Sequence, residues 1–345
     1  MPPATTSTAP DAQRLSEIER GLFFIVGCGR SGTTLLQTML LSDASVILPP
    51  ETKYYTALEV HGWRNRFDLT QDDAFSSATR LVWEDQARRG LDCDRAVFER
   101  FARAAERSWD GLFLAYLAAY AEPSGATRVG EKSPVHTHCV GPLSASFPNA
   151  KFIHMVRDPR AVILSRIRAG FGSNLVEPNI HRWRRAAEMH RDHAERLGPE
   201  RYLLVRYEEL VTDQRATLAR VCAFLGIELT DAMLEHHKRD DKGFPERSKD
   251  WMENTTKPVF TSSVEKWKQE LPAAHAAMID TALGGHVGAM GYEPSGASAP
   301  MVGLRLTLSR LAGKVEAVAG KAKRAALFVL RGFKRSPIPE EPGSD

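Results

Sequence analysis

The chain has 345 residues, 43% of them hydrophobic, and a formal net charge of +3, which predicts one large globular domain with or without appendages. No stretch approaches the ~18 consecutive apolar residues that a transmembrane helix needs, so none is expected. The four cysteines lie far apart, without a CxxC pair or a His/Cys cluster, which argues against a zinc site and against a disulfide framework.

The first residues, "MPPATTSTAPDAQ", have neither the basic start nor the apolar core of a secretory signal. Residues 1–20 are therefore predicted to form a disordered tail. Scattered thiols favour a reducing compartment, so a cytoplasmic location is expected, with a peripheral position at the inner membrane face as its variant.

Short apolar runs alternate with helical patterns after this tail. The runs are predicted strands and cover 22–26, 45–48, 151–156 and 201–205. Strands that alternate with helices predict a parallel sheet covered on both faces, here a three-layer α/β fold of the P-loop type. Ligands of such folds lie at the carboxyl ends of the strands, where Gly27, Glu51 and Arg157 fall.

Two regions depart from this alternation. Residues 56–125 have apolar positions at helical spacing and are predicted to form a mostly helical insertion over the sheet. The main domain is expected to span 21–294. A change of composition after "GYEPSGASAP" predicts a linker and a tail over 295–345.

The stretch "FFIVGCGRSGTTLL" is close to a nucleotide-triphosphate P-loop. Gly27 and Gly32 have the spacing of that motif, but Thr33 and Thr34 stand where it has Lys followed by Ser or Thr. A strand, a glycine turn and a helix N-terminus present backbone N–H groups to an anion. Without the lysine, the loop predicts a phosphate-like ligand but no triphosphate–metal chemistry, and no metal is expected.

This loop, "GCGRSGTTLL", resembles the 5′-phosphosulfate-binding loop of the sulfotransferases that use 3′-phosphoadenosine-5′-phosphosulfate (PAPS). The resemblance implies that the donor's phosphosulfate is bound by the following residues: Arg30, Ser31, Gly32, Thr33 and Thr34. It also implies that Arg30 stabilises charge during the transfer, with 3′-phosphoadenosine-5′-phosphate (PAP) as the product.

The stretch "FIHMVRDPRAVILSRI" resembles the 3′-phosphate motif of the same family. Its Arg stands at a strand end, here Arg157, and its Ser follows eight residues later in the next helix, here Ser165. The planar guanidinium suits a phosphate, and the hydroxyl two turns up the helix can reach the same group. The residues alone leave open that Arg157 pairs with Asp158 or with a helix terminus.

Among sulfotransferases, the pattern resembles the tyrosylprotein sulfotransferase branch and its bacterial relatives. That branch has an acid–Thr–basic triplet after its second strand, matched here by "ETK", with Glu51 twenty-one residues after Arg30. The resemblance implies that Glu51 is the general base, which a neutral hydroxyl nucleophile needs. The alternative is an acid favoured near a helix start after Pro49 and Pro50.

Further segments match the family by resemblance. In "GEKSPVH", Lys132 is the candidate that neutralises charge on the leaving oxygen, or else an exposed loop lysine. Tyr207 in "VRYEELV" is expected to contact the nucleotide. In "KPVFTSSVEKW", Lys257 and Lys266 match the basic positions of a segment that closes over the phosphate end.

Two positions depart from the family. An Arg expected twelve residues after Arg157 is Ala169 here, so that contact is either absent or made by Arg168. The hydroxyl that helps the transition state in the tyrosylprotein branch falls on Trp251 in an ungapped comparison. Ser248 and Thr255 are the alternatives for its role.

Histidines and aromatic residues give weaker signals. His136 and His138 lie near Lys132, and other sulfotransferases use a His as base, but a solvated or hydrogen-bonded structural role is favoured for both. His154 lies inside an apolar strand and is expected in the core. The aromatic residues of the helical region are also expected to be core: Trp63, Phe67, Trp83, Trp109 and Tyr116.

The segment 303–335 contains nine Lys or Arg and one acid, so it has a charge of +8, and the rest of the chain has −5. Leu304, Leu308, Leu311 and Val315 begin an apolar stripe at alternating four- and three-residue spacing. This predicts a basic amphipathic helix, which can bind an anionic membrane, dock on its own domain or a partner chain, or be disordered. Nucleic acid is not expected, because the polar face lacks interleaved aromatics.

The sequence thus predicts a PAPS-dependent sulfotransferase that transfers a sulfuryl group to a hydroxyl of a carbohydrate, lipid or tyrosine-like acceptor by in-line displacement. Two alternatives stay open: a P-loop kinase of a small molecule, and a non-catalytic module that binds PAP or a membrane.

Overall fold

The computed structural model describes residues 9–91, 93–170, 174–239, 257–308, 311 and 315. Its centre is a five-stranded sheet in the order β2-β3-β1-β4-β5, and every neighbouring pair is parallel. The strands are Phe23–Gly27 (β1), Val46–Ile47 (β2), Arg128–Lys132 (β3), Lys151–Val156 (β4) and Tyr202–Arg206 (β5). The predicted parallel sheet is confirmed.

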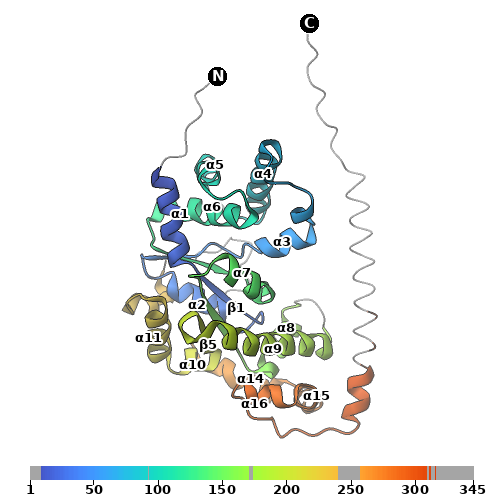
Figure 1. The fold of residues 1–345 in the computed structure, drawn as a ribbon. Coiled ribbons are helices and arrows are strands. Elements are labelled where there is room, and N and C mark those ends of the chain that lie inside the picture. Colours follow the sequence, from blue (N-terminus) through green and yellow to red (C-terminus); the bar gives the residue numbers. More distant parts are fainter. Residues whose placement is uncertain are drawn as a thin grey trace.

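Helices cover both faces of the sheet (Figure 1). One face is covered by the helical region together with helices from before and after it. Its elements are α1 (Ala9–Gly21), α3 (Tyr54–Val60), η1 (Trp63–Asn65), α4 (Asp72–Arg88), α5 (Arg95–Ala104), α6 (Trp109–Ala121), η2 (Glu122–Ser124), η3 (Pro134–Cys139), α7 (Val140–Ser146) and α9 (Val176–Arg201). The opposite side has α2 (Thr33–Leu40), α10 (Tyr207–Thr212), α11 (Gln214–Leu225), α12 (Asp231–Leu234) and η4 (His236–Lys238).

Strand β1 shows why the fold has three layers. Side chains alternate between the two faces of a strand. Phe24 and Val26 accordingly join the apolar cluster that contains α1 and α3 to α7, whereas Phe23 and Ile25 join the cluster that contains α2, α10 and α11. All four are at most 1% exposed, so β1 is the buried centre of the sheet.

Strand β3 was not among the predicted strands. Its sequence, "RVGEK", is short, has a central glycine and ends in two charged residues, all of which weaken a strand prediction. The glycine has a packing reason: a Cβ on Gly130 would lie 2.4 Å from Cζ of Phe23. Because β3 lies between β2 and β1, Lys132 ends a central strand and does not lie in a loop.

The predicted disordered tail over 1–20 is wrong from Ala9 onward, where α1 begins. Leu15 and Ile18 of this helix are 5% and 0% exposed and belong to the main core cluster. The stretch 56–125 contains α4, α5, α6 and most of α3, which form the upper part of the molecule in Figure 1.

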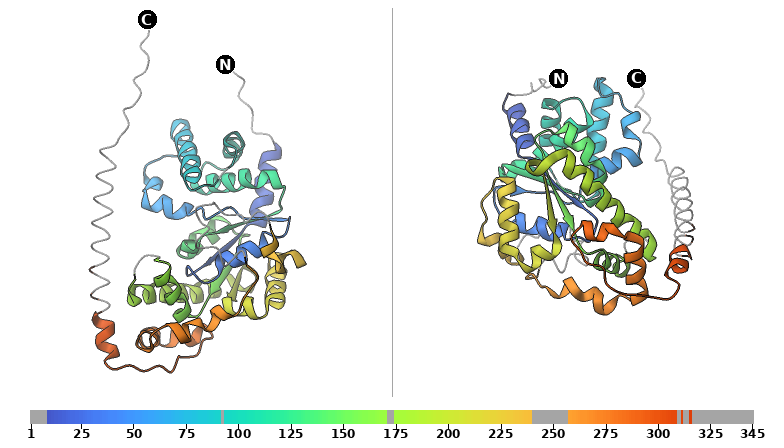
Figure 2. Two further views of the ribbon diagram at one scale, coloured as in Figure 1. Left: turned by 180° about the vertical axis from the view of Figure 1, so that it is seen from behind. Right: turned by 60° about the horizontal axis from the view of Figure 1, so that its bottom comes forward.

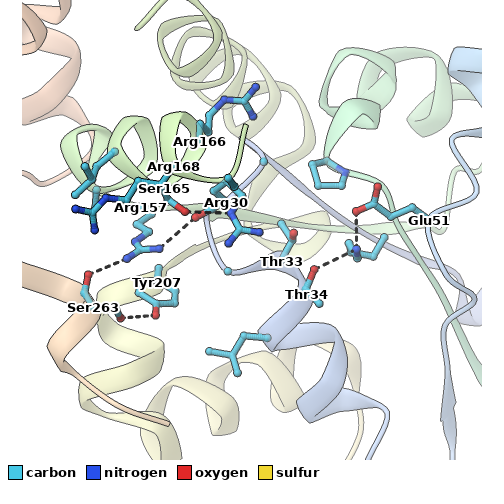
Figure 3. A pocket seen from close by; sticks show the side chains of 18 of the residues that line it. Arg30, Thr33, Thr34, Glu51, Arg157, Ser165, Arg166, Arg168, Tyr207 and Ser263 are labelled. Carbon is cyan, nitrogen blue, oxygen red and sulfur yellow. Dashed lines mark hydrogen bonds and ion pairs between the residues drawn. The ribbon is translucent and has the colours of Figure 1, made fainter. Parts of the chain in front are cut away.

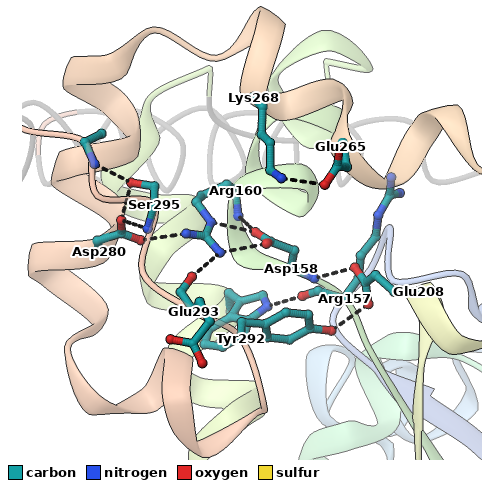
Figure 4. A network of polar contacts seen from close by, with 12 residues as sticks. Arg157, Asp158, Arg160, Glu208, Glu265, Lys268, Asp280, Tyr292, Glu293 and Ser295 are labelled. Atoms are coloured by element: carbon teal, nitrogen blue, oxygen red, sulfur yellow. Dashed lines mark hydrogen bonds and ion pairs between the residues drawn. The ribbon is translucent and has the colours of Figure 1, made fainter.

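The C-terminal part of the domain packs on α8 (Pro159–Arg168) and α9. It consists of α14 (Ser262–Glu270), α15 (Ala273–Leu283) and α16 (Gly285–Ala289), which lie together at the lower end in both views of Figure 2. Arg160 joins these helices to α8: it bonds Asp158 at 2.7 Å and Asp280 at 3.3 Å, and donates to the Glu293 carbonyl at 2.8 Å (Figure 4).

Only the beginning of the basic tail is described. Leu306 is 5% exposed and belongs to the cluster around α8 and α9, whereas Leu304, Leu308, Leu311 and Val315 are 47–70% exposed. These four stripe residues do not pack on the domain, so an anionic surface or a partner chain stays as the prediction for them. The remainder of the predicted amphipathic helix lies outside the described residues. No helix within the described ranges is long and apolar enough to cross a membrane.

Candidate active site

A cavity of about 920 Å³ opens at the carboxyl ends of the strands. It is bounded by the loop after β1, the turn before α3, the end of β3, helix α8, Tyr207 and helix α14. Parallel strands bring their ends to one edge, which explains why segments far apart in the sequence meet here. The sequence-predicted residues that line the cavity are Arg30, Gly32, Thr33, Thr34, Glu51, Lys132, Arg157, Ser165, Tyr207 and Lys266.

The glycines of the loop after β1 are required by the backbone. Gly27 has φ +134° and Gly32 has φ +90°, in the range that favours glycine. A Cβ would lie 2.2 Å from the Met155 carbonyl oxygen at Gly27, and 2.5 Å from Cδ2 of Tyr207 at Gly32. Arg30 also has a positive φ, 82°. The loop therefore turns tightly before α2, whose N-terminal N–H groups face the cavity edge.

Several guanidinium groups gather beside this loop (Figure 3). Arg30 Nε donates to Ser165 Oγ at 3.1 Å, and Arg157 donates to the Arg30 carbonyl at 3.4 Å. Burial, followed by the charges of Arg157 and Arg166, lowers the pKa of Arg30 below its ordinary value. Like charges this close repel one another, so an anion bound among them would be stabilised strongly.

Arg157 is fixed by groups that leave its charge uncompensated. It donates to the Ser263 carbonyl at 2.8 Å and lies over the Tyr207 ring, 4.2 Å from its centroid. The Tyr207 hydroxyl in turn contacts Ser263 Oγ at 2.7 Å. The alternative pairing with Asp158 does not occur, because that carboxylate is bonded to Arg160.

Two buried polar atoms of the site have no hydrogen-bond partner within the described part of the chain. They are Nε of Arg157 and Oγ of Ser31. Buried polar groups are almost always hydrogen-bonded. Arg157 lines the cavity, so its unbonded Nε, together with the glycine turn, fits a site built to hold an oxyanion ligand.

On the other side of the cavity, Glu51 is paired with two lysines. Its Oε1 lies 2.7 Å from Lys132 Nζ, and its Oε2 lies 3.4 Å from Lys53 Nζ. Lys132 also donates to Thr34 Oγ1 at 3.3 Å, and its side chain is 1% exposed, so it is not an exposed loop lysine. Burial raises the pKa of Glu51, but the charge and hydrogen bond of Lys132 and the charge of Lys53 outweigh it and lower that pKa overall.

The remaining predicted positions differ in their relation to the cavity. Lys266 lines it and pairs with Glu270 at 3.6 Å, whereas Lys257 is exposed and is not among the lining residues. Arg168 lines the cavity and is also paired with Glu270. Ser31 is buried within the loop and does not line the cavity. Trp251, Ser248 and Thr255, considered for the missing hydroxyl, lie outside the described residues.

Some lining residues were not singled out from the sequence. Ser263 holds Arg157 and Tyr207 in place, yet it lies in a segment noted only for its basic residues. Arg88 and Arg89 reach the cavity from the end of α4. A helix surface with two arginines gives no sequence signal that separates it from an ordinary solvated face.

The histidines have structural partners. His136 is fully buried with Nδ1 2.8 Å from Glu131 Oε2. His138 Nδ1 lies 3.1 Å from the Met189 sulfur. His154 is 1% exposed and lies 2.6 Å from the Tyr202 hydroxyl, which confirms the predicted core position. The aromatic residues expected in the core are buried or packed against it.

A comparison with protein families identifies the family of this chain. The model of the sulfotransferase family matches residues 23–231, from β1 to the start of α12. The chain belongs to the sulfotransferase family. The match contains the glycine loop, the turn at Glu51, Lys132 and Arg157, which are the cavity residues described above.

Named relatives of this sulfotransferase are animal enzymes. Protein-tyrosine sulfotransferase 2 of Gallus gallus is 29% identical over 80% of this chain and 70% of its own length. Protein-tyrosine sulfotransferase of Drosophila melanogaster is 28% identical over 82% of this chain and 54% of its own length. The family and these relatives indicate a transferase enzyme.

Solved structures agree with the fold. The sulfotransferase domain of the Synechococcus PCC 7002 olefin synthase has a TM-score of 0.56 and 24% identity, with 79% of this chain and 94% of that chain covered. The sulfotransferase domain of the curacin biosynthetic pathway has a TM-score of 0.54 and 21% identity, with 79% and 98% covered.

The predicted cytoplasmic location, including its inner-membrane variant, is wrong. The comparison with its relatives, which are named protein-tyrosine sulfotransferases, overturns this expectation. Scattered cysteines count against a disulfide framework, but they do not define a compartment.

Proposed function

We propose that this sulfotransferase transfers a sulfuryl group from PAPS to an acceptor hydroxyl and releases PAP. One observation supports this most: a single cavity holds an anion loop and a second guanidinium site on one side, and a Glu51–Lys132 pair on the other. Such a cavity can bind a donor with phosphate groups at both ends and present its reacting end to a base.

Donor binding uses the two cationic ends of the cavity. The backbone and hydroxyls of the loop at Thr33 and Thr34, with Arg30, would hold the phosphosulfate. Arg157 and Ser165 would hold the 3′-phosphate. The Ser165 hydroxyl accepts a hydrogen bond from the Arg30 side chain, and Arg157 donates one to the Arg30 carbonyl. The two ends of the proposed site therefore share Arg30.

The transfer itself is a displacement at sulfur. The acceptor oxygen forms a bond to sulfur while the bond from sulfur to the leaving phosphate oxygen breaks, and the acceptor proton passes to the Glu51 carboxylate. The lowered pKa of Glu51 keeps it ionised at neutral pH and so able to accept that proton. Lys132, which lies between Glu51 and Thr34, is placed to stabilise the charge on the leaving oxygen.

We propose a tyrosine-like hydroxyl of a peptide as the acceptor. The relatives are named protein-tyrosine sulfotransferases. Lys53, Arg88 and Arg89 line the cavity on the side of Glu51. Asp85 pairs with both arginines and Glu51 pairs with Lys53, so the remaining excess of positive charge would attract acidic groups near the hydroxyl. A carbohydrate or lipid hydroxyl is the competing outcome of the acceptor screen below.

A ligand comparison tests the donor. The midpoint of thermal unfolding is measured with PAP, with ADP, and with ATP plus Mg²⁺ at equal concentrations. PAP is expected to stabilise most, because binding to the native state alone raises stability with affinity. Preferential stabilisation by ATP with Mg²⁺ would favour the kinase alternative and refute the proposal.

A transfer assay tests the reaction. Radiolabelled PAPS is incubated with the enzyme and with tyrosine peptides, glycans or lipids, with Glu51→Gln as the matched control. Label in the tyrosine peptide, absent with Glu51→Gln, is expected. Tight PAP binding without transfer to any acceptor would instead indicate the non-catalytic module.

A further inference from the structure

The turn that bears the proposed base is held by a second tripeptide. Residues 51–53, "ETK", face residues 131–133, "EKS", at the end of β3, and each residue of one segment contacts one residue of the other. The pair of Glu51 with Lys132 is one of these three contacts. The other two involve no lining residue of the cavity except Lys53, and the proposed reaction does not account for them.

Glu131 is the centre of these two contacts. Its Oε1 accepts from the Thr52 hydroxyl at 2.8 Å and from the Ser133 hydroxyl at 2.5 Å. Ser133 Oγ accepts from the Lys53 amide at 3.1 Å. One carboxylate therefore fixes Thr52 directly and Lys53 through a single hydroxyl.

The turn needs such support. Lys53 has φ +49°, in the left-handed region that a non-glycine residue rarely adopts, and its own side chain does not cap α3; the Tyr54 amide donates instead to Thr52 Oγ1 at 3.3 Å. Strain of this kind persists only where the surroundings fix it. The bond from the Lys53 amide to Ser133 is the contact that fixes it here.

Glu131 is also a buried charge with a dedicated partner. Glu131 and His136 are both 0% exposed, and His136 Nδ1 lies 2.8 Å from Glu131 Oε2. Burial raises the pKa of Glu131, but the charge and hydrogen bond of His136, with those of Ser133 and Thr52, lower it overall, so Glu131 is a carboxylate. A buried carboxylate, even when it is fully hydrogen-bonded, contributes little net stability compared with apolar residues of the same size. The placement of Glu131 at the end of β3 therefore needs a reason other than stability.

The short helix η3, which contains His136, also contacts the anion loop. Thr137, next to His136 in η3, accepts from the Gly27 amide at 2.8 Å and donates to the Gly27 carbonyl at 3.2 Å. The base turn and the donor loop are thus both bonded to the segment 131–137.

We propose that Glu131, with Ser133 and His136, is the positioning residue of the general base and sets the place of Glu51 relative to the donor loop. This inference rests on the sulfuryl transfer proposed above. It assigns Glu131 no contact with the donor or the acceptor. Its effect is on geometry, where a misplacement of ~1 Å can cost about 100-fold in rate.

The test compares Glu131→Gln with Asp110→Asn. Asp110 is a matched control because its carboxylate also accepts two hydroxyl bonds, from Tyr55 and Ser146 at 2.7 Å each, and it does not line the cavity. In Glu131→Gln we expect kcat to fall about 10- to 100-fold, with the KM for PAPS and the stabilisation by PAP within twofold of wild type. Asp110→Asn is expected to keep the wild-type kcat.

Hydrogen exchange supplies a readout that does not depend on activity. The amides of 51–54 are expected to exchange at least tenfold faster in Glu131→Gln than in wild type and in Asp110→Asn, because Asp110 bonds Tyr55, which lies outside this range. If Glu131→Gln is too unstable to purify, Ser133→Ala takes its place, with Ser133→Thr expected to restore both exchange protection and kcat.

The outcomes separate the two proposals. If the wild-type enzyme transfers the sulfuryl group, and Glu131→Gln has the same kcat and the same exchange rates, the positioning role is overturned and the proposed function stands. Equal loss of protection in Asp110→Asn overturns the positioning role too, because the effect is then general destabilisation. Faster exchange only in Glu131→Gln, with no transfer from PAPS even by wild type, refutes the proposed function, and with it the positioning of a base, while showing that Glu131 holds the turn at residues 51–53.

Discussion

Replacing Lys132 with Met is the sharpest perturbation of the site. Met keeps the length of the side chain but removes an ammonium group that is 1% exposed and 2.7 Å from Glu51 Oε1. Two unit charges at that separation attract by about 6 kcal/mol at an effective dielectric constant of ~20. The Glu51 side chain is 29% exposed and still has Lys53 as a partner in the variant. We therefore expect the free energy of unfolding to fall by about 3 kcal/mol, the lower end of the range for breaking a buried pair.

The same change is expected to lower kcat about 100- to 1,000-fold, as does removal of one preorganised donor to a developing charge. The acid limb of kcat/KM should move to higher pH, since burial raises the pKa of Glu51 once Lys132 no longer opposes it. The folded-state pKa of Glu51 is lowered in wild type, so the stability it contributes is present above the unfolded-state pKa and is lost as the pH falls through the folded-state value. The stability difference between wild type and Lys132→Met should therefore be largest at neutral pH and shrink in acid.

The assays are urea unfolding at pH 7 and pH 4 and a pH profile of kcat/KM. Lys53→Met is the matched control, because Lys53 pairs with the same carboxylate at 3.4 Å but its side chain is 45% exposed, and such pairs are worth at most about 1 kcal/mol. A Lys132→Met enzyme with kcat within threefold of wild type and an unshifted acid limb would refute the role assigned to Lys132.

Three further predictions follow from the contacts described. Arg157→Ala should weaken PAP binding about 100-fold in calorimetry, which corresponds to the loss of about 2–3 kcal/mol for bonds to a charged group. Binding of adenosine 5′-phosphosulfate, which has no 3′-phosphate, should change less than threefold. Equal losses for the two ligands would contradict the 3′-phosphate assignment. Gly32→Ala should lower the unfolding free energy by about 2 kcal/mol in urea, because φ is +90° and a Cβ would lie 2.5 Å from Tyr207; wild-type stability would show that the loop relaxes freely. Stability should fall as the pH drops below about 6.5, because burial lowers the pKa of His154 to about 3 and of His193 to about 4. Only the unfolded chain then takes up those protons, at a cost to the free energy of unfolding of about 1.4 kcal/mol per pH unit for each histidine. A urea-unfolding stability that stays constant from pH 6.5 to 4.5 would contradict this.

The parallel sheet and the donor side of the site were predictable because their signals are local. The apolar run at 22–26 and the glycines that follow it encode a strand and a tight turn within a dozen residues. Arg157 and Ser165 are likewise only eight residues apart, one directly after β4 and the other in the second turn of α8. Backbone chemistry of this kind does not depend on which other segments pack nearby.

The features that the sequence did not predict depend on distant partners. Strand β3 has too few apolar residues to be distinguished from a loop, and its pairing on both sides, with β1 and β2, makes it a strand. The burial of Lys132 and Glu131 follows from that position. The helix at Ala9–Gly21 was missed because the polar start of the chain obscures Leu15 and Ile18, which pack on residues far along the chain.

The donor side of the cavity also has a consequence for biosynthesis. Ser263 on α14 bonds both Arg157 and Tyr207, so the proposed 3′-phosphate end is completed by a helix made long after the anion loop. A ribosome-bound chain that ends before α14 has the loop, Arg157 and Tyr207 but not Ser263, which fixes Arg157 and Tyr207. Parallel strands that pair across such separations fold slowly, and a nucleotide that binds only the completed site stabilises the domain at its last step. The donor's supply would then influence how much enzyme matures, in addition to how fast the enzyme turns over.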